Sequence, residues 1–482
     1  MPPNYYLKPE TALSKAKELI KVGKKQNALE MLYEMMKLKR GRVWHKNLQD
    51  LMVLFVDLCV ELRKNIYFRK VIYLYKSMVV QECPQSMELV LDHYLSSIKK
   101  LTEEAHQKSK DAVLDIEDLD ALDTPESLML NAVTTEGVQD RSDKAILGPW
   151  LRFLWESYRL VLDLLRTMSK FEGFYYGIAL EAYDFCIKYG RKNEFKKLTE
   201  ALRVHSTRNQ WQSNQQPPNP ELQSLQIRIR MKQLDSAMDL EMYNDAFRAV
   251  EDIWGFFALS KKAGKSLVMK EYYTRISDLF FRSGSHLFHA AALLKLMNLS
   301  KEHKKTITIE EITTQASQVL CAILAIPLPQ ERLNFDKLLT SGESNAAKMK
   351  SLAVLLGLPT VPTRQTLIRD FLAFRVMNIL PQELRKLFAV LETEFQPLKM
   401  YELIRPSLEF VKAQPELSSY LTNLEEVCIA KTVLQVSQVF RSIDFDHLCS
   451  LCPMVPPIKF ERILVELIHN LELPIRIDHR NQ

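Results

Sequence analysis

The chain has 482 residues, of which 47% are hydrophobic and 26% are charged, and its formal net charge is +6. These values are ordinary for a folded globular protein, and the mild charge does not by itself indicate a nucleic-acid-binding protein. A length of this order predicts about three domains. Only 12 residues are glycine, which excludes glycine-rich phosphate loops and disfavours β-sandwiches, so a mainly helical fold is expected.

Neither a membrane segment nor a secretion signal is predicted. The longest apolar run near the N-terminus, Leu51 to Leu62, is interrupted by Asp57 and is far shorter than the roughly 18 residues that a membrane helix needs. The first ten residues lack the apolar segment of a signal peptide. The seven cysteines are scattered, which fits reduced thiols better than a disulfide framework. We therefore expect a cytoplasmic protein with no membrane partner.

Three segments, at 12–32, 237–250 and 273–294, have the pattern of paired amphipathic helices with small residues where the helices touch. The alternation of small and large residues is typical of tetratricopeptide-like hairpins, although their full consensus is absent. Because one hairpin cannot cover its own apolar face, such units stack into a solenoid and leave long surfaces for partners. An irregular helical domain is the alternative interpretation.

A basic run follows the first of these segments. It consists of Lys37, Lys39, Arg40, Arg42 and Lys46, with Trp44 among them. Cations that contact phosphates, next to a ring on which a base can stack, are the usual components of an RNA-binding surface. We therefore regard these six residues as a candidate RNA contact. A solvated helix end is the alternative.

Two interruptions separate the helical segments. Between Lys108 and Arg141 the sequence is acidic, and we interpret this stretch as an insertion or linker that is partly disordered. A calcium loop needs oxygen ligands around a glycine, and Asp115 to Asp123 contains no glycine. The stretch from Asn209 to Glu221 is rich in Gln, Asn and Pro and predicts an exposed loop between helices.

Residues that could carry catalysis or bind a metal do not form recognisable motifs. The Gly-Lys-Ser triplet at 264–266 lacks the first glycine of a phosphate loop. Cys449 and Cys452 have the spacing of half a zinc site without a second pair, so we interpret them as core thiols. His286 and His289 have no third ligand nearby in the sequence, and a surface or core role is the better interpretation. We predict no enzyme activity, no cofactor, no metal and no small-molecule substrate.

The C-terminal segment changes its hydrophobic period. A helix that ends near Phe440, a short helix from His447 to Cys452 and a helix after Pro457 are followed by Ile475-Arg476-Ile477-Asp478. In this last stretch apolar and charged residues alternate, as in a half-buried strand. Helix, short helix, helix and strand in this order predict a winged helix. Its third helix is too acidic to follow phosphates, so we expect it to contact protein rather than DNA.

Helical repeats that run into a terminal winged helix resemble the PCI domain, which is found in scaffold subunits of the proteasome lid, the signalosome and eukaryotic initiation factor 3. Shorter motifs narrow the resemblance to the family of the largest subunit, called a, of that initiation factor. They are GKKQ at 23–26, VLDIEDLD at 113–120, TPES at 124–127, FLWESYR at 153–159, AVEDI at 249–253, ALSKK at 258–262, LLGL at 355–358, PTR at 362–364 and IRIDH at 475–479. These motifs are collinear and cover essentially the whole chain.

The resemblance implies an all-α fold, a right-handed TPR-like solenoid that ends in a PCI domain whose winged helix adds a small β-sheet. The implied domains are TPR-like helical repeats at 1–105, an acidic insertion or linker at 106–146, a helical solenoid at 147–304 and a PCI domain at 305–482, with the winged helix at about 428–482. The acidic motif from Asp115 to Asp120 matches the family, but the match does not explain its role.

The resemblance also implies a non-catalytic scaffold subunit of eukaryotic initiation factor 3. Such a scaffold pairs with the c subunit of the factor. It also docks on the small ribosomal subunit, where ribosomal proteins, rRNA and mRNA are the expected partners. In this family neighbouring PCI domains join their winged-helix sheets, so we expect the exposed strand of Ile475, Arg476, Ile477 and Asp478 to pair the subunits. A PCI scaffold of another complex and a stand-alone RNA-binding adaptor are the alternatives.

Overall fold

The computed structural model describes residues 9–37, 46–116, 146–166, 168–213, 220–259, 266–303, 308–328, 345–393, 396, 399–471 and 477. Within these ranges all regular structure is helical and no strand is assigned. None of the described helices is both long enough and apolar enough to cross a membrane. The contacts divide the chain into two units, Met1–Ile229 and Arg230–Gln482, and the boundary between them falls within helix α11.

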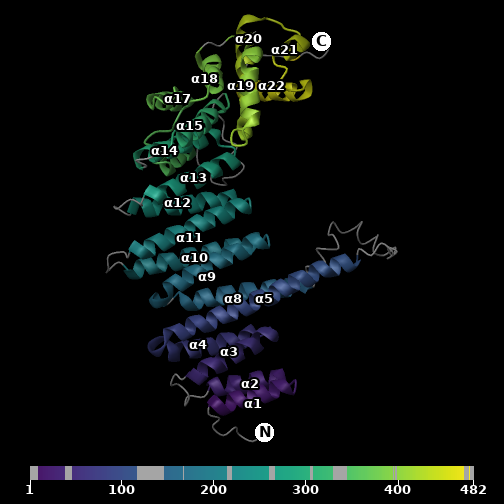
Figure 1. Ribbon diagram of the computed structural model, residues 1–482, viewed down its shortest axis with the longest axis vertical. Helices are drawn as coiled ribbons and strands as arrows, with labels where there is room; N and C mark the ends of the chain where they lie inside the picture. Colours follow the sequence, from purple (N-terminus) through teal and green to yellow (C-terminus); the bar gives the residue numbers. More distant parts are fainter. Residues whose placement is uncertain are drawn as a thin grey trace. The chain divides into compact units, whose positions relative to one another are not determined.

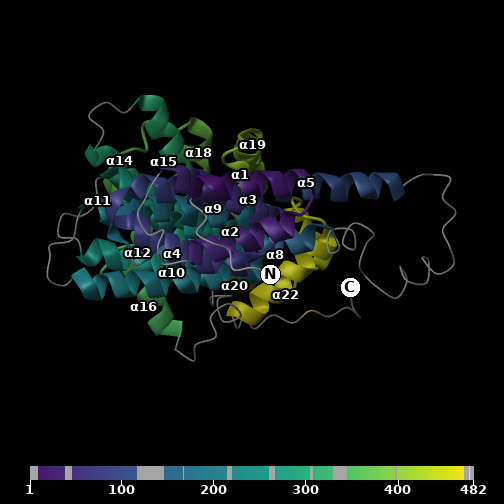
Figure 2. The same cartoon turned by 90° about the horizontal axis from the view of Figure 1, so that it is seen from below.

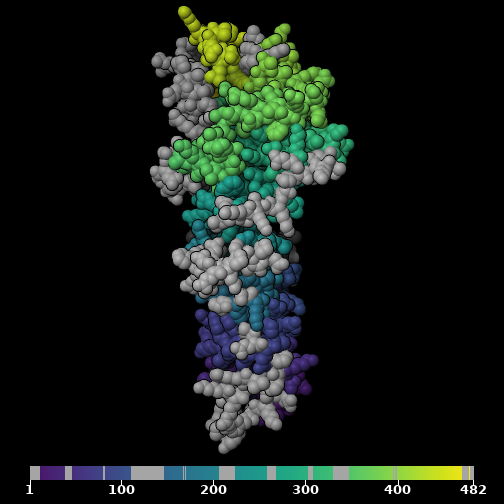
Figure 3. All heavy atoms as spheres, turned by 90° about the vertical axis from the view of Figure 1, so that its left-hand side faces the viewer, coloured from purple at the N-terminus to yellow at the C-terminus, as the bar shows by residue number. Residues whose placement is uncertain are grey.

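The first unit consists of antiparallel helices in two layers (Figures 1 and 2). Its elements are α1 (Pro9–Lys21), α2 (Lys25–Lys37), α3 (Lys46–Glu61), α4 (Asn65–Glu82), α5 (Pro84–Ile116), α8 (Gly148–Leu165), η3 (Ser169–Phe171), α9 (Glu172–Lys188), α10 (Lys192–Ser213) and the start of α11 (Pro220–Asp239). Helices α1, α3 and α5 contact one another in one layer, and α2, α4 and α8 do so in the other. The purple, blue and teal parts of this unit follow one another in chain order (Figure 3).

The second unit is built around α14, which packs against α13, α15 and α17. Its elements after α11 are α12 (Tyr243–Leu259), α13 (Ser266–Arg282), α14 (His286–His303), α15 (Ile309–Leu324), α16 (Asn345–Leu355), α17 (Arg364–Ala373), α18 (Gln382–Phe388), η5 (Ala389–Thr393), α19 (Met400–Ala413), η6 (Ser418–Tyr420), α20 (Leu421–Val439), α21 (Phe445–Leu451) and α22 (Pro457–Leu471). Apolar side chains from Leu287 to Leu294 are buried on nearly every side of α14, as expected for a helix in the centre of a core.

The three predicted helix pairs are confirmed as α1–α2, α11–α12 and α13–α14. Small residues lie where the paired helices touch: Ala12, Ala16 and Ala28 in the first pair and Ala237 and Ala246 in the second are fully buried. A methyl group at these positions lets the two backbones approach, and the larger apolar residues beside them fill the space between neighbouring hairpins.

Within the described ranges, six helices end in the same Schellman turn, in which one residue adopts a positive φ. That residue is Gly23, Arg63, Gly190, Glu241, Gly284 or Gly357. In the first turn the amide of Gly23 donates to the carbonyl of Ile20 at 2.9 Å, and the amide of Lys24 donates to that of Leu19 at 3.0 Å. A left-handed backbone costs a residue with a Cβ atom about 1 kcal/mol relative to glycine. Among these six positions, Arg63 and Glu241 are therefore the two at which the residue present is less stable than glycine would be.

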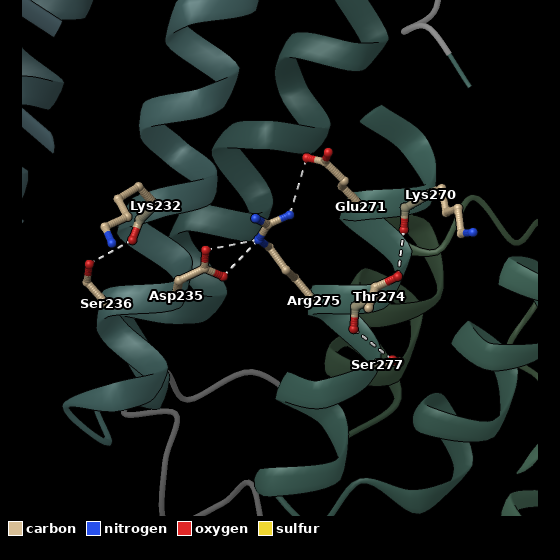
Figure 4. A network of polar contacts seen from close by, with 8 residues as sticks. All are labelled: Lys232, Asp235, Ser236, Lys270, Glu271, Thr274, Arg275 and Ser277. Carbon is tan, nitrogen blue, oxygen red and sulfur yellow. Dashed lines mark hydrogen bonds and ion pairs between the residues drawn. The ribbon is translucent and has the colours of Figure 1, made fainter. Parts of the chain in front are cut away.

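A bidentate ion pair joins α11 to α13 (Figure 4). The Nε atom of Arg275 donates to both carboxylate oxygens of Asp235, at 2.8 and 3.1 Å, and its Nη1 atom lies 3.5 Å from Glu271. Burial raises the pKa of Asp235, and the hydrogen bond and charge of Arg275 offset only part of that effect. The guanidinium therefore holds a half-buried carboxylate at the contact of the two helices.

Two sequence-based boundaries differ from the structure. The predicted loop from Asn209 to Glu221 is wrong at both ends, because α10 continues to Ser213 and α11 begins at Pro220. Proline is well tolerated at the first position of a helix, and the polar residues before Ser213 extend a helix that earlier apolar residues anchor. In the acidic segment, residues 106–116 belong to α5, and 117–145 lie outside the described residues.

The turn at Glu241 allows a test of the backbone argument. We expect Glu241→Gly to stabilise the protein by about 1 kcal/mol, because glycine adopts the positive φ without steric cost. Gly190→Ala should destabilise it by a similar amount, since a Cβ atom there would meet no neighbour within 4 Å and only the backbone conformation is affected. Urea unfolding would measure both shifts, with Glu241→Ala as the control. A destabilised Glu241→Gly variant would contradict the argument.

Candidate protein-interaction site at the C-terminal helices

The last three helices of the second unit follow the predicted order of helix, short helix and helix. Helix α22 packs on α20, and of its apolar residues at helical spacing Phe460, Ile463, Leu464 and Leu467 are buried, whereas Ile468 is half-buried. The ring of Phe445 on α21 lies 6.1 Å from that of Phe460, with an interplanar angle of 67°. This edge-to-face contact fixes the short helix against α22.

The predicted pairing strand lies almost entirely outside the described residues. Of Ile475, Arg476, Ile477 and Asp478, only Ile477 is described; its side chain is half-buried and no strand is assigned to it. The small sheet of the predicted winged helix is therefore not confirmed by the described part of the chain.

The basic run is described only at its two ends. Lys37 is the last residue of α2 and Lys46 is the first residue of α3, and both are exposed. Lys39, Arg40, Arg42 and Trp44 lie outside the described residues. The structure thus leaves the candidate RNA contact a prediction.

Large apolar side chains are exposed around α22. Ile458 is 86% exposed and Val465 is 51% exposed, and their spacing of seven residues places them on one face of the helix. At the end of α20, Val439 is 73% exposed. The same face of α22 carries the surface ion pair between Arg462 and Glu466 at 3.3 Å. A surface that combines apolar side chains with both positive and negative charges is typical of protein binding rather than phosphate binding.

A buried ion cluster holds α20 in place. The Nζ atom of Lys431 lies 2.8 Å from the carboxylate of Glu392 and 2.6 Å from the carbonyl of Leu391. An Nη2 atom of Arg364, at the start of α17, lies 2.6 Å from the same carboxylate. The cluster therefore joins α17, η5 and α20. Removal of one member of such a buried cluster typically costs about 3–5 kcal/mol.

The cluster is held in its charged form. Burial raises the pKa of Glu392, but the contacts with the positively charged Arg364 and Lys431 outweigh it, so the net pKa is lowered. Burial lowers the pKa of Lys431, and the contact with Glu392 opposes this change. The Nε and Nη2 atoms of Arg364 are both buried without a hydrogen-bond partner among the described residues, so its contact with Glu392 is an ion pair. The guanidinium thus contributes its charge more than a full set of hydrogen bonds.

A second anchor connects α20 to the centre of the unit through His289. Its Nδ1 atom lies 2.8 Å from the carbonyl of Ser277, and its Nε2 atom lies 2.8 Å from the hydroxyl of Tyr420. A neutral imidazole satisfies both contacts: Nδ1–H donates to the carbonyl and Nε2 accepts from the hydroxyl. Burial lowers the pKa of His289 to about 4, although the bond to Ser277 opposes the shift. Of the surface and core roles left open by the sequence, the structure shows the core role for His289.

The cysteine pair of α21 lies close to the core. Cys452 is buried and Cys449 is half-buried, and burial raises the pKa of both thiols. Among the described residues, no three His, Cys, Asp or Glu side chains are grouped as metal ligands. The position of Cys452 agrees with its interpretation as a core thiol.

The two polar anchors could not be found from sequence spacing. His289 and Tyr420 are 131 residues apart, and Lys431 and Glu392 are 39 apart. None of these residues belongs to a motif. The sequence contains one indirect indication. A histidine within the strongly apolar α14 is expected to be buried, and a buried histidine needs hydrogen-bond partners, which the sequence does not identify.

Comparisons with known proteins identify related chains along the whole sequence. A family model described as "eIF3a, PCI domain, TPR-like region" matches residues 10–399, and a PCI domain model matches residues 407–482. The a subunit of eukaryotic translation initiation factor 3 from Homo sapiens is 43% identical over 488 residues, which cover 100% of this chain and 35% of that protein. The Drosophila grimshawi protein of the same name is 39% identical, covering 99% of this chain and 55% of that protein. The chain spans about a third of the length of the human relative.

The neutral His289 makes the stability of the protein depend on pH. Because its pKa falls from 6.5 to about 4 on folding, the unfolded chain binds a proton between these values and the folded chain does not. Stability should therefore decrease as pH falls from 6.5 towards 4, by up to about 3 kcal/mol from this residue. Urea unfolding at several pH values would measure the decrease.

His289→Phe should reduce this pH dependence and lower the stability at pH 7, since the carbonyl of Ser277 and the hydroxyl of Tyr420 lose their partner. His447→Gln, which changes an exposed histidine on α21, is the matched control and should keep the wild-type profile. If His289→Phe and wild type showed the same pH dependence, the assignment of a neutral buried His289 would be wrong.

Proposed function

Because the chain belongs to the family of the a subunit of eukaryotic translation initiation factor 3, we propose that it is part of a non-catalytic scaffold subunit of that initiation factor. In this proposal it pairs with the c subunit, docks on the small ribosomal subunit in the cytoplasm, and promotes pre-initiation complex assembly and mRNA recruitment. The observation that carries the proposal is the family match from residue 10 to residue 482. This match disfavours a scaffold of the proteasome lid or the signalosome and a stand-alone RNA-binding adaptor.

We propose a division into TPR-like helical repeats at 1–105, an acidic insertion or linker at 106–146, a helical solenoid at 147–304 and a PCI domain at 305–482. The last part, from about 428, would be a winged helix. Support comes from the order of α20, α21 and α22. A strand that follows α22 would complete the order of elements in a winged helix.

Subunit pairing is proposed to run through the strand of Ile475, Arg476, Ile477 and Asp478. An exposed strand has unpaired backbone N–H and C=O groups, and a second chain can add to it by β-augmentation. The exposed Ile458 and Val465 on the neighbouring α22 support a protein partner, since apolar side chains of this size at a surface are typical of interaction sites.

Docking on the small ribosomal subunit is proposed to use the basic run between α2 and α3. Lys37 and Lys46 are exposed at the two helix ends that flank it, which supports access of a phosphate backbone to this part of the chain. Each cation that neutralises a phosphate releases a condensed counterion, so binding through this run would weaken as salt is added.

The pairing strand can be tested by replacing both isoleucines with aspartate. We expect Ile475→Asp with Ile477→Asp to abolish co-purification with the c subunit, because two charges on the apolar side of the strand oppose its burial. The helical repeats should stay folded, as judged by an unchanged circular dichroism spectrum. Arg476→Gln, on the opposite side of the strand, is the control. Undiminished recovery of the c subunit with the double variant would refute the pairing strand.

The basic run can be tested by charge reversal. Lys39→Glu, Arg40→Glu and Arg42→Glu together should weaken binding to purified small ribosomal subunits by tenfold or more at low salt, with a smaller effect at high salt. Sedimentation with the ribosomal particles would measure the affinity. Lys21→Glu, at the end of α1, is a control for the reversal of a single charge outside the basic run. Equal affinity of the triple variant at low salt would count against this contact.

A further inference from the structure

The hairpin of α3 and α4 separates most of its charges between its two helices, the exceptions being Lys46 at the start of α3 and Glu82 at the end of α4. From residue 47 to 61 the sequence contains Asp50, Asp57 and Glu61 and no lysine or arginine. From residue 62 to 81 it contains five lysines and arginines and no aspartate or glutamate. Since α3 and α4 lie in different layers of the first unit, the outer side of α4 is positively charged.

Cations and large apolar residues alternate on this outer side. Val71, Ile72 and Tyr75 face the core and are fully buried, whereas Ile66 is 70% and Tyr73 is 44% exposed. We define the α4 face as the exposed or half-buried residues of this side together with the turn before it. It consists of Arg63, Lys64, Ile66, Tyr67, Arg69, Lys70 and Tyr73. Lys76 is excluded, because its Nζ atom donates to the carbonyl of Leu164 at 3.1 Å.

The nearby carboxylates are engaged elsewhere. Glu61 pairs with Lys25 at 2.7 Å, Asp57 contacts His93 at 2.7 Å, and Glu156 accepts from Asn65 at 3.1 Å. Within the described part of the chain, none of the four cations of the α4 face forms an ion pair. Its positive charge is therefore available to an external anion.

Aromatic rings lie beside these cations, in a row that crosses three helices. Tyr33 of α2 meets Tyr67 of α4 edge to face, with ring centroids 5.1 Å apart. The Nζ atom of Lys64 lies 5.7 Å from the centre of the Tyr67 ring, and the guanidinium of Arg63 lies 5.2 Å from the centre of the Trp150 ring on α8. Rings on α2, α4 and α8 therefore lie next to one another or next to a cation of the turn before α4.

Arg63 occupies a position where a glycine would be more stable. Its φ is +53°, and four of the six equivalent turns have glycine there. The arginine costs about 1 kcal/mol relative to glycine, forms no ion pair among the described residues, and contacts the Trp150 ring. The cation–π contact contributes about 0.5–1 kcal/mol and offsets much of this cost, so the arginine places a positive charge beside the ring.

We propose that the α4 face binds single-stranded RNA without base specificity. The four cations contact successive phosphates, and the Tyr73 ring and the row of Tyr67 and Trp150 provide surfaces for bases. An acidic peptide would need the cations alone; the presence of aromatic rings beside the cations favours a nucleic-acid strand. The choice of RNA over DNA rests on the proposed ribosome docking. The site is separate from the basic run between α2 and α3.

The number of cations sets the expected salt dependence. Each phosphate contact to a single strand contributes about −0.7 to the slope of log affinity against log salt concentration. Four contacts give a slope of about −3, which corresponds to a loss of about 50-fold between 50 and 200 mM salt.

The test measures the fluorescence anisotropy of a labelled 15-nucleotide polyuridine RNA with the full chain at several salt concentrations. Arg69→Glu with Lys70→Glu should weaken binding more than tenfold and make the slope less negative by about 1.4. Arg63→Gly should weaken it several-fold while the folded state is kept or stabilised, because glycine suits this turn. Glu241→Gly, the same kind of exchange in another turn, is the matched control and should bind as wild type.

Several outcomes would overturn the inference. The first is that the wild-type chain does not bind RNA at 50 mM salt. The second is that both α4 variants bind with wild-type affinity. The third is that binding is lost only when the charges of Lys39, Arg40 and Arg42 are reversed. Preferential binding of a labelled polyglutamate peptide by the same face would also overturn it. Co-purification with the c subunit should be unaffected by the α4 variants. Its absence in wild type would refute the proposed scaffold function and leave the RNA result standing.

Discussion

The Schellman turn between paired helices is the constraint on which the stacked architecture depends. Each turn reverses the chain within a few residues and satisfies two carbonyls at the end of the first helix. The second helix of the pair therefore starts at a fixed rotation relative to the first. This rotation decides which residues meet in the hairpin, where alanines allow close approach, and which remain outside to contact the next pair or the solvent.

Polar anchors within the second unit complement this local constraint. Helices α17, α18 and α21 have 10, 7 and 7 residues and are shorter than the helices of the repeats, so hairpin packing alone does not fix this region. The contact of His289 with Tyr420 and the cluster around Glu392 connect these helices to residues far away in the sequence. Both anchors are buried, and an unpaired partner would be costly. They therefore select one arrangement of the C-terminal helices over other apolar packings.

Local sequence patterns predicted those features of the fold that depend on residues close together in the chain. The pairs α1–α2, α11–α12 and α13–α14 follow from helical periodicity and buried alanines, and the buried face of α22 follows from the spacing of Phe460 to Leu467. The loop expected from composition after Asn209 starts too early, because Gln and Asn are also compatible with a helical turn. The ion cluster and the partner of His289 depend on tertiary contacts, which residue spacing does not encode. The strand at Ile475 to Asp478 remains a prediction from period alone.

The opposite charges of α3 and α4 have a consequence for the approach of a polyanion from solution. The carboxylates of α3 lie on one layer and the cations of the α4 face on the other, so this hairpin contributes an electric dipole across the first unit. In the field of a phosphate backbone this dipole orients the protein so that the basic layer faces the phosphates before any contact forms. Oriented encounters raise the association rate, and this gain is lost once salt shortens the Debye length to about 8 Å. The charge separation within one hairpin thus acts on the kinetics of encounter as well as on the equilibrium of binding.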